Sequence, residues 1–329
     1  MSIRNLILSV TIPVAFLSAN AWSQGAESDY PSKPITIVVG YPGDGSTFLE
    51  WRMYAQAMTE ATGKRFIMDP RGGGGTTIGT AFVAKAAPDG YTVLGASSPF
   101  TIAPSVYPDL PYDNIRDFRA VSLMSKKVYL LLVHPDSPIK TVQDYIAFAR
   151  ANPGKLNFGT GGLGAATHLP GELLHFMTGT KATFVHYKRS SERITDLMAK
   201  RTDAALSSPL AQYANVKAGK LRAIGVTSLQ RLPLILDLPT IDEQGVKGYD
   251  VSNWIGMVAP AKVSTNIVNR LHGMLMLATK DPNVVKRLQT DASIIVGSAP
   301  EEFQRHLVAE TNRWRNLIKE TGIKPADDD

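Results

Sequence analysis

The amino-acid sequence predicts an α/β protein of two lobes, in which the first lobe is discontinuous and two strands form the hinge. Three observations support this prediction. Strand-like and helix-like segments alternate along the chain, two apolar strands lie where the chain could leave a lobe and return to it, and glycine and hydroxyl residues gather where strands meet helices. The length of 329 residues leaves room for about two domains of ordinary size.

The alternation begins at Ile35–Val39, a β-branched run that ends at Gly40 and is expected to be a buried strand. A helix is expected over 47–62, with Gly63 as its C-terminal stop. Further strands are expected at 66–68, 91–94, 129–133, 155–158, 183–187, 204–206 and 221–226. Further helices are expected at 80–87, 142–151, 266–280 and 300–321. Three more helices are expected, one that begins near 167, one that ends at 200 and one that ends at 218. This order is typical of parallel sheets covered by helices.

Two apolar strands, 128–133 and 254–258, each run into a turn marked by proline. They lie where the chain could leave one lobe and later return to it. We therefore expect a first lobe made of residues 29–128 and 254–329, closed by the C-terminal helices, and a second lobe made of residues 129–253. With two strands as the hinge, this is the topology of a hinged ligand-binding protein.

Four junctions between a strand and a helix are rich in glycine and small hydroxyl residues, namely 40–47, 95–98, 159–167 and 206–208. At such junctions unpaired backbone N–H groups and the helix dipole favour an anion. Glycine lets the backbone approach a ligand closely, and serine or threonine adds a short donor. Any one of these segments is equally explained as an ordinary tight turn. Four of them, divided between two lobes, favour a ligand-binding cleft.

The composition is that of a globular protein, with 44% hydrophobic and 19% charged residues. The formal net charge is +6, but lysine and arginine are scattered singly or in pairs, which argues against a nucleic-acid partner. The sequence contains no cysteine, so disulfides, thiolate catalysis and cysteine-ligated metals are excluded.

The first residues have the pattern of a secretory signal peptide. Arg4 precedes an apolar stretch at 6–17, and Ala19-Asn20-Ala21 gives the small-x-small pattern of a cleavage site. The apolar stretch is too short to span a membrane. We therefore expect residues 1–21 to be removed and the rest of the chain to be a free periplasmic protein.

Motifs of nucleotide, metal and hydrolase sites are incomplete in this sequence. Residues 159–164 spell G-x-G-x-x-G, but no acidic residue ends the following strand to hold a ribose. His168, Glu172 and His175 could share one helical face as metal ligands, although their apolar neighbours favour packing instead. No phosphate-binding loop and no G-x-S-x-G nucleophile elbow occur. We expect no cofactor, no metal and no catalysis.

Five blocks of the sequence resemble the receptors of tripartite tricarboxylate transporters, the Bug family. The first is Tyr30-Pro31-Ser32-Lys33-Pro34-Ile35-Thr36-Ile37-Val38-Val39, and the others lie at 84–92, 217–223, 238–240 and 254–260. The likeness covers nearly the whole mature chain. It implies a two-lobed, type II periplasmic binding protein fold that captures a small carboxylate and delivers it to membrane permease subunits. We expect the receptor to be a monomer.

The candidate ligand-binding residues come from the four loops, which are also the binding loops that the resemblance implies, together with one basic residue in the second lobe. They are Tyr41, Ser46, Thr47, Phe48, Ser97, Ser98, Thr160, Gly161, Ala165, Ala166, Thr167, Arg189, Ser207 and Ser208.

Two of these positions depart from the usual pattern of the family and indicate a ligand. Thr47 is followed by Phe48 instead of an aspartate, which removes a partner for an amino group and allows an aromatic contact. Arg189 brings a guanidinium, whose fork suits a carboxylate, to a loop that is normally kept small. We therefore expect an aromatic dicarboxylate such as terephthalate. Alternatively, Arg189 is solvated or ion-paired at the rim and Phe48 packs into its own helix.

Other functions stay open at this point. An aliphatic di- or tricarboxylate receptor and a ligand sensor would use the same fold. An α/β hydrolase or transferase that uses Ser97 or Ser207 is disfavoured, because the sequence offers no base beside either serine.

Overall fold

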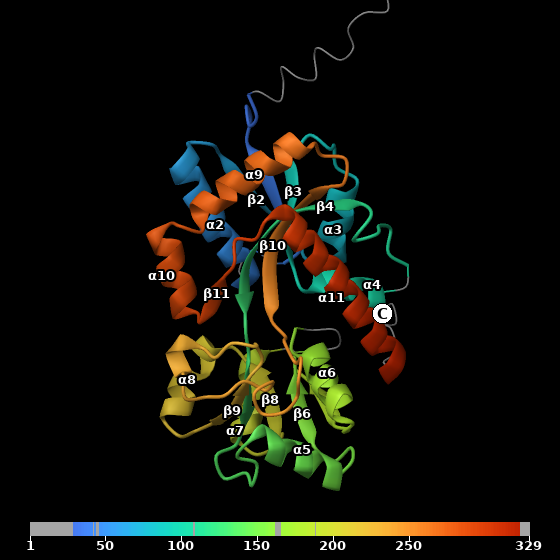
Figure 1. Cartoon of the computed structure of the whole chain (residues 1–329), viewed down its shortest axis with the longest axis vertical. Coiled ribbons are helices and arrows are strands. Elements are labelled where there is room, and N and C mark those ends of the chain that lie inside the picture. The colour runs from blue at the N-terminus through green and yellow to red at the C-terminus, as the bar shows by residue number, and fades with distance from the viewer. Residues whose placement is uncertain are drawn as a thin grey trace, which may run out of the picture.

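The computed structural model describes residues 29–322, apart from 42, 44–45, 108, 162–165 and 188. The predicted signal peptide, residues 1–21, lies outside the described residues. The described chain forms two lobes stacked along the long axis of the molecule (Figure 1). Within these ranges, no helix is both long enough and apolar enough to cross a membrane.

The first lobe is built on a six-stranded mixed sheet with the order β11-β4-β10-β3-β1-β2. Its strands are β1 (Ile35–Val39), β2 (Phe66–Pro70), β3 (Thr92–Ser97), β4 (Phe118–Lys127), β10 (Asn253–Pro260) and β11 (Ser293–Ile295). Its helices are α2 (Ser46–Thr62), η1 (Gly74–Thr76), α3 (Thr77–Ala84), α4 (Pro99–Val106), α9 (Thr265–Ala278), α10 (Pro282–Thr290) and α11 (Pro300–Thr321). Strand β1 pairs in parallel with β2 and β3, whereas β10 runs antiparallel to β3 and β4.

The second lobe is built on a five-stranded sheet with the order β7-β6-β8-β5-β9. Its strands are β5 (Leu130–Val133), β6 (Asn157–Thr160), β7 (Thr183–His186), β8 (Ala204–Ser207) and β9 (Arg222–Val226). Its helices are α5 (Val142–Ala151), α6 (His168–Thr178), α7 (Ser190–Met198), α8 (Pro209–Lys217) and η2 (Pro233–Ile235). Helix α5 has the predicted bounds because a capping box fixes its start, in which Thr141 and Asp144 bond each other's backbone N–H groups.

The chain crosses between the two sheets twice, which confirms the predicted discontinuous first lobe. Strand β4 ends at Lys127 in the first sheet, and β5 begins at Leu130 in the second. The return crossing lies between β9 and the start of β10 at Asn253. The predicted strand at 129–133 therefore belongs wholly to the second lobe as β5, and the first crossing is the short segment Val128-Tyr129 that follows β4.

Strand β4 is not predicted by the sequence pattern, because serine and lysine interrupt its apolar run. The structure buries Ser122 and Ser125, and their hydroxyl groups donate to Ser298 O at 2.8 Å and to Glu50 Oε1 at 2.6 Å. Buried polar side chains are tolerated in a strand when such partners exist. Helix α4, which contains an internal proline, and the short elements α10 and β11 are also not predicted. The predicted loop at 95–98 is mostly strand, since β3 continues to Ser97.

Helix α11 packs on both lobes. Its N-terminal half places Phe303 and Leu307 in a hydrophobic cluster of the first lobe. Its C-terminal half places Trp314 and Leu317 in the main hydrophobic cluster of the second lobe. In Figure 1 the helix runs obliquely from the first lobe toward α6 of the second. The two lobes are therefore joined by this helix as well as by the two chain crossings.

Candidate ligand-binding site between the lobes

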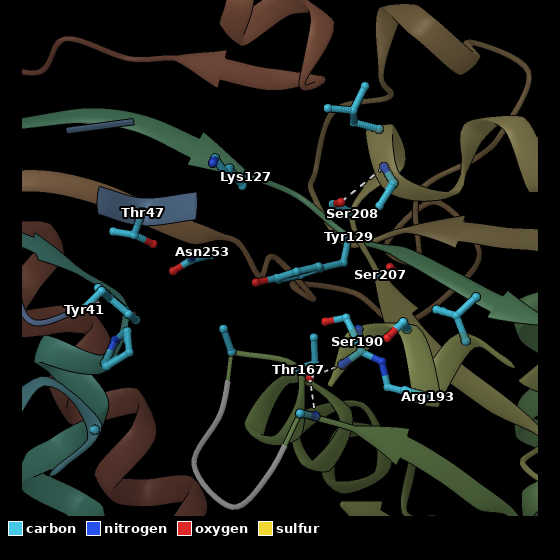
Figure 2. Close-up of a pocket in the computed structure, with 18 of the residues that line it drawn as sticks. Tyr41, Thr47, Lys127, Tyr129, Thr167, Ser190, Arg193, Ser207, Ser208 and Asn253 are labelled. Carbon is cyan, nitrogen blue, oxygen red and sulfur yellow. Dashed lines mark hydrogen bonds between the residues drawn. The ribbon is translucent and has the colours of Figure 1, made fainter. Parts of the chain in front are cut away.

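A cavity of about 1100 Å³ is lined by residues of both lobes. This volume is slightly above the usual range of about 300–1,000 Å³ for small-molecule sites in proteins. Its walls are formed where strands end and helices begin, and the labelled side chains in Figure 2 lie around a common space. Residues of three of the four predicted junctions, 40–47, 159–167 and 206–208, therefore line this cavity, and they come from both sheets.

Seven of the predicted site residues line the cavity. They are Tyr41, Thr47, Gly161, Ala166, Thr167, Ser207 and Ser208. Ser46 is the first residue of α2. Ala165 lies outside the described residues.

Three predicted hydroxyl residues lie behind the described cavity lining and hold it in place. Ser97 Oγ lies 3.0 Å from Tyr41 Oη, and this contact orients the Tyr41 ring at the wall. Ser98 Oγ accepts from Trp254 N–H at 3.0 Å and so ties the end of β3 to β10. Thr160 Oγ1 lies 2.7 Å from His186 Nδ1 at the ends of β6 and β7. These residues support the walls instead of facing the cavity.

The two residues on which the ligand prediction depends are also absent from the described cavity lining. Phe48 is buried, with 8% of its surface exposed, and packs in the main hydrophobic cluster of the first lobe. It follows Thr47 in α2, and the turn of about 100° per helical residue directs it away from the wall and into the core. Arg189 is exposed and precedes the first turn of α7.

The most informative lining residue, Arg193, is not predicted by the sequence. It lies in α7 next to the buried Ile194 and one turn before the buried Leu197, and only 4% of its surface is exposed. Its Nη1 donates to Thr167 Oγ1 at 3.0 Å, and its Nε finds no acceptor among the described residues. Burial lowers the pKa of Arg193, but an arginine stays charged at neutral pH. A charged residue inside the apolar stripe of a helix is the signal that could have identified it.

The hydroxyl oxygen of Thr167 accepts two hydrogen bonds. Its Oγ1 receives one hydrogen bond from Gly161 N–H at 2.9 Å and another from Arg193 Nη1 at 3.0 Å. A hydroxyl oxygen has two acceptor sites and one proton to donate. Both acceptor sites are used, so a further hydrogen bond of this hydroxyl to a group in the cavity that Thr167 lines is one that it donates.

Two helices of the second lobe also begin at this wall. Ser190 and Ser191 form the first turn of α7, and Ser208 caps α8 by accepting from Ala211 N–H at 3.4 Å. The first turns of helices carry unpaired N–H groups and a partial positive charge. Together with Arg193 and Thr167, they make the wall of the second lobe rich in donors and positively charged.

The opposite wall carries a cation that already has a partner. Lys127, at the end of β4, lies with its Nζ 2.5 Å from Glu50 Oε2. Near it lie Thr47 and Asn253, and the ring of Tyr129 projects from the first crossing between the lobes (Figure 2). Burial raises the pKa of Tyr129, so its hydroxyl stays protonated and can donate. Lys127, Tyr129 and Asn253 are not predicted as site residues, because their roles depend on where the crossings bring them.

The metal and hydrolase alternatives find no support in the described geometry. His175 is buried, its ring nitrogens lie 2.8 Å from Tyr145 Oη and 2.7 Å from Thr180 Oγ1, and burial lowers its pKa to about 4. Among the described residues, no three His, Cys, Asp or Glu side chains are grouped to hold a metal ion. Ser97 bonds a tyrosine, and neither Ser97 nor Ser207 has a histidine or carboxylate as a hydrogen-bond partner in this part of the chain.

Two sheets joined by two crossings, with a donor-rich cavity between them, define a two-lobed binding protein of the periplasmic type. The chain belongs to the tripartite tricarboxylate transporter family of receptors, whose family model matches residues 51–323.

Comparisons with individual proteins agree with this assignment. The chain is 36% identical over 310 residues to a UPF0065 protein in the tcbD-tcbE intergenic region of Pseudomonas sp. (strain P51), covering 94% of this chain and 92% of that protein. It is similar in structure to the R. palustris protein Rpa4515 with adipate, with a TM-score of 0.76, 32% identity and coverage of 91% and 100%. It is also similar to the periplasmic binding protein BugD, with a TM-score of 0.73, 30% identity and coverage of 90% and 99%. The predicted fold and family are thereby confirmed, and one of these relatives, BugD, is a periplasmic binding protein.

Proposed function

We propose that this protein is a periplasmic receptor that captures a small carboxylate between its two lobes and delivers it to the permease of a tripartite tricarboxylate-type transporter. The observation that carries the proposal is Arg193, a buried guanidinium on the cavity wall with no acidic partner among the described residues. A buried charge without a partner is costly, and a bound carboxylate supplies the missing partner.

The chemistry around Arg193 suits a carboxylate. Its Nε–H is unpaired, and the neighbouring Thr167 hydroxyl has a proton to donate. Two donors side by side can each bond one oxygen of a carboxylate, and charge-assisted hydrogen bonds of this kind are the strong ones. The similar structure with adipate, a dicarboxylate, supports the same ligand class for this chain.

We propose further that the ligand is an aromatic dicarboxylate such as terephthalate. Arg193 takes the place of Arg189 as the residue that binds a carboxylate, and Tyr129 takes the place of Phe48 as the aromatic contact. Both Arg193 and Tyr129 line the cavity. Tyr41 and Tyr107 add two more rings to the lining. Aromatic side chains stack on a flat ligand ring and gain about 0.5–1.5 kcal/mol beyond the burial of area. Aliphatic dicarboxylates are the alternative ligands.

Titration calorimetry on the mature protein tests the proposal with four acids: terephthalate, benzoate, adipate and hexanoate. The variant Arg193→Met keeps the length of the side chain and removes its charge, and we expect affinity for every acid to fall by about 100-fold. The matched control Arg189→Met removes a guanidinium from the exposed end of the same helix and should change affinity less than about twofold. Wild-type affinity in Arg193→Met, or no binding of any acid to the wild-type protein, would contradict the receptor proposal.

Delivery to a permease is tested separately from binding. Deletion of the gene should abolish uptake of the acid that binds best, and Arg193→Met should fail to restore it. If uptake persists while expression of transport genes changes, the protein is a ligand sensor instead.

A further inference from the structure

Glu50 is a buried carboxylate that fixes the position of a cavity lysine. It lies on α2, and its side chain is 4% exposed. Ser125 Oγ donates to Glu50 Oε1 at 2.6 Å, and Lys127 Nζ lies 2.5 Å from Glu50 Oε2. A buried carboxylate needs such partners, because an unpaired charge in the interior is costly. The ammonium group of Lys127 is therefore held at one place.

That place is at the cavity and at the crossing between the lobes. Lys127 is the last residue of β4, its side chain is 17% exposed, and it lines the cavity. An ammonium group has three N–H donors, and the described partner, Glu50, does not use all of them. In Figure 2 the ring of Tyr129 lies between Lys127 and Arg193, so the two cations face the cavity from different sides.

We infer that Lys127 is a specificity-determining residue that recognises the second anionic group of a dicarboxylate, and that Glu50 is its positioning residue. This inference rests on the proposed function, in which Arg193 binds the first carboxylate. Glu50 balances the charge of Lys127 when the ligand has a single carboxylate, so a monocarboxylate still binds through Arg193. A dicarboxylate gains additional charge-assisted hydrogen bonds from Lys127.

The position of Lys127 also connects ligand length to closure of the lobes. Arg193 belongs to the second lobe, whereas Lys127 belongs to the sheet of the first. A ligand that reaches both cations contacts both lobes, and a ligand shifts a hinge equilibrium only by its better binding to the closed form. A dicarboxylate therefore favours closure more than the matching monocarboxylate.

The test compares the affinities of two matched pairs of acids, terephthalate with benzoate and adipate with hexanoate, by titration calorimetry on the mature protein. In Lys127→Met the preference for the dicarboxylate of each pair should fall by about tenfold. The matched control is Lys126→Met, which removes the neighbouring half-buried lysine of β4, a residue outside the described cavity lining. It should leave the preference unchanged within about twofold.

Lys127→Met leaves Glu50 buried without its cation and can destabilise the protein. The double variant Glu50→Gln/Lys127→Met removes both charges. Its preference for the dicarboxylate of each pair should again be about tenfold lower than that of Glu50→Gln alone. An unchanged preference in the double variant, with both acids of a pair still bound, overturns the role of Lys127 and leaves the receptor proposal intact. If the wild-type protein binds none of the four acids, the receptor proposal fails, and this inference fails with it.

Discussion

The two walls of the cavity handle buried charge in opposite ways. On the second lobe, Arg193 is almost fully buried and has no acidic partner among the described residues. On the first lobe, Lys127 contacts Glu50, a carboxylate supplied by the protein itself. The charge on the first wall is thus balanced within the protein, whereas the charge on the second wall has no such balance among the described residues. Under the proposed function, this difference predicts that a carboxylate anchors on the second lobe and that the first lobe adds selectivity.

The contrast between the two walls should be removed most strongly by a variant that gives Arg193 an acidic partner within the protein. Thr167 is in direct contact with Arg193, so Thr167→Asp places a carboxylate where the hydroxyl now lies. We expect terephthalate affinity to fall by about 100-fold or more, because the internal carboxylate competes with the ligand for the same cation. Calorimetry measures the affinity, and a rise in melting temperature should accompany the loss. Thr167→Asn is the uncharged control, and equal losses in both variants would contradict this account.

Unlike the cavity walls, the two lobes resemble each other in one respect: each contains a histidine whose pKa is lowered, His175 in the second lobe and the partly buried His306 in the first. Burial lowers the pKa of His175 in the second lobe and of His306 in the first to about 4, against 6.5 for an exposed histidine. Below pH 6.5 the unfolded chain binds protons that the folded chain excludes, so stability falls as the pH is lowered from 6.5 to 4.

At pH 5 each histidine should reduce the free energy of unfolding by about 2 kcal/mol relative to pH 7.5. Urea unfolding at the two pH values measures this loss. In His306→Gln about half of it should disappear, because one of the two histidines whose pKa is lowered to about 4 is removed. The substitution breaks no hydrogen bond of His306 Nε2 among the described residues. A loss that is unchanged by this substitution would show that other groups titrate.

A smaller effect tests the contribution of the Thr167 hydroxyl group. Thr167→Val keeps the shape of the side chain and removes the hydroxyl, and with it the bonds to Gly161 N–H and Arg193. Carboxylate affinity should fall by about tenfold, the value of one hydrogen bond to a charged group. Ser98→Ala is the matched control, because Ser98 also carries a structural hydroxyl but stands outside the described lining. Equal losses in the two variants would assign the effect to the scaffold.

The smallest effect concerns Phe48. Because Phe48 packs in the core of the first lobe, Phe48→Leu should lower the free energy of unfolding by about 1 kcal/mol and leave terephthalate affinity within about twofold. The control Tyr129→Leu removes a ring that lines the cavity, and it should weaken terephthalate more than adipate. A selective loss of terephthalate in Phe48→Leu would return the aromatic contact to Phe48.

Much of the fold follows from local sequence patterns. Strand β1 and helices α5 and α11 have the predicted bounds, because β-branched runs, capping residues and amphipathic repeats act within a few residues of one another. Strand β4 is different: its serines are stable in the core only because Glu50 and Ser298, far away in the sequence, accept hydrogen bonds from their hydroxyl groups. No local pattern contains that information.

The sequence by itself determined the two-lobed α/β architecture, the family, and three of the loops that line the cavity. It did not determine which side chains of those loops face the cavity. Arg189 and Arg193 are four residues apart, yet one is exposed and the other is buried against Thr167. The tertiary structure decided this, and it also paired Lys127 with Glu50. The physical reason is that burial and charge compensation depend on residues that are distant in the sequence, whereas helix and strand formation depend mainly on near neighbours.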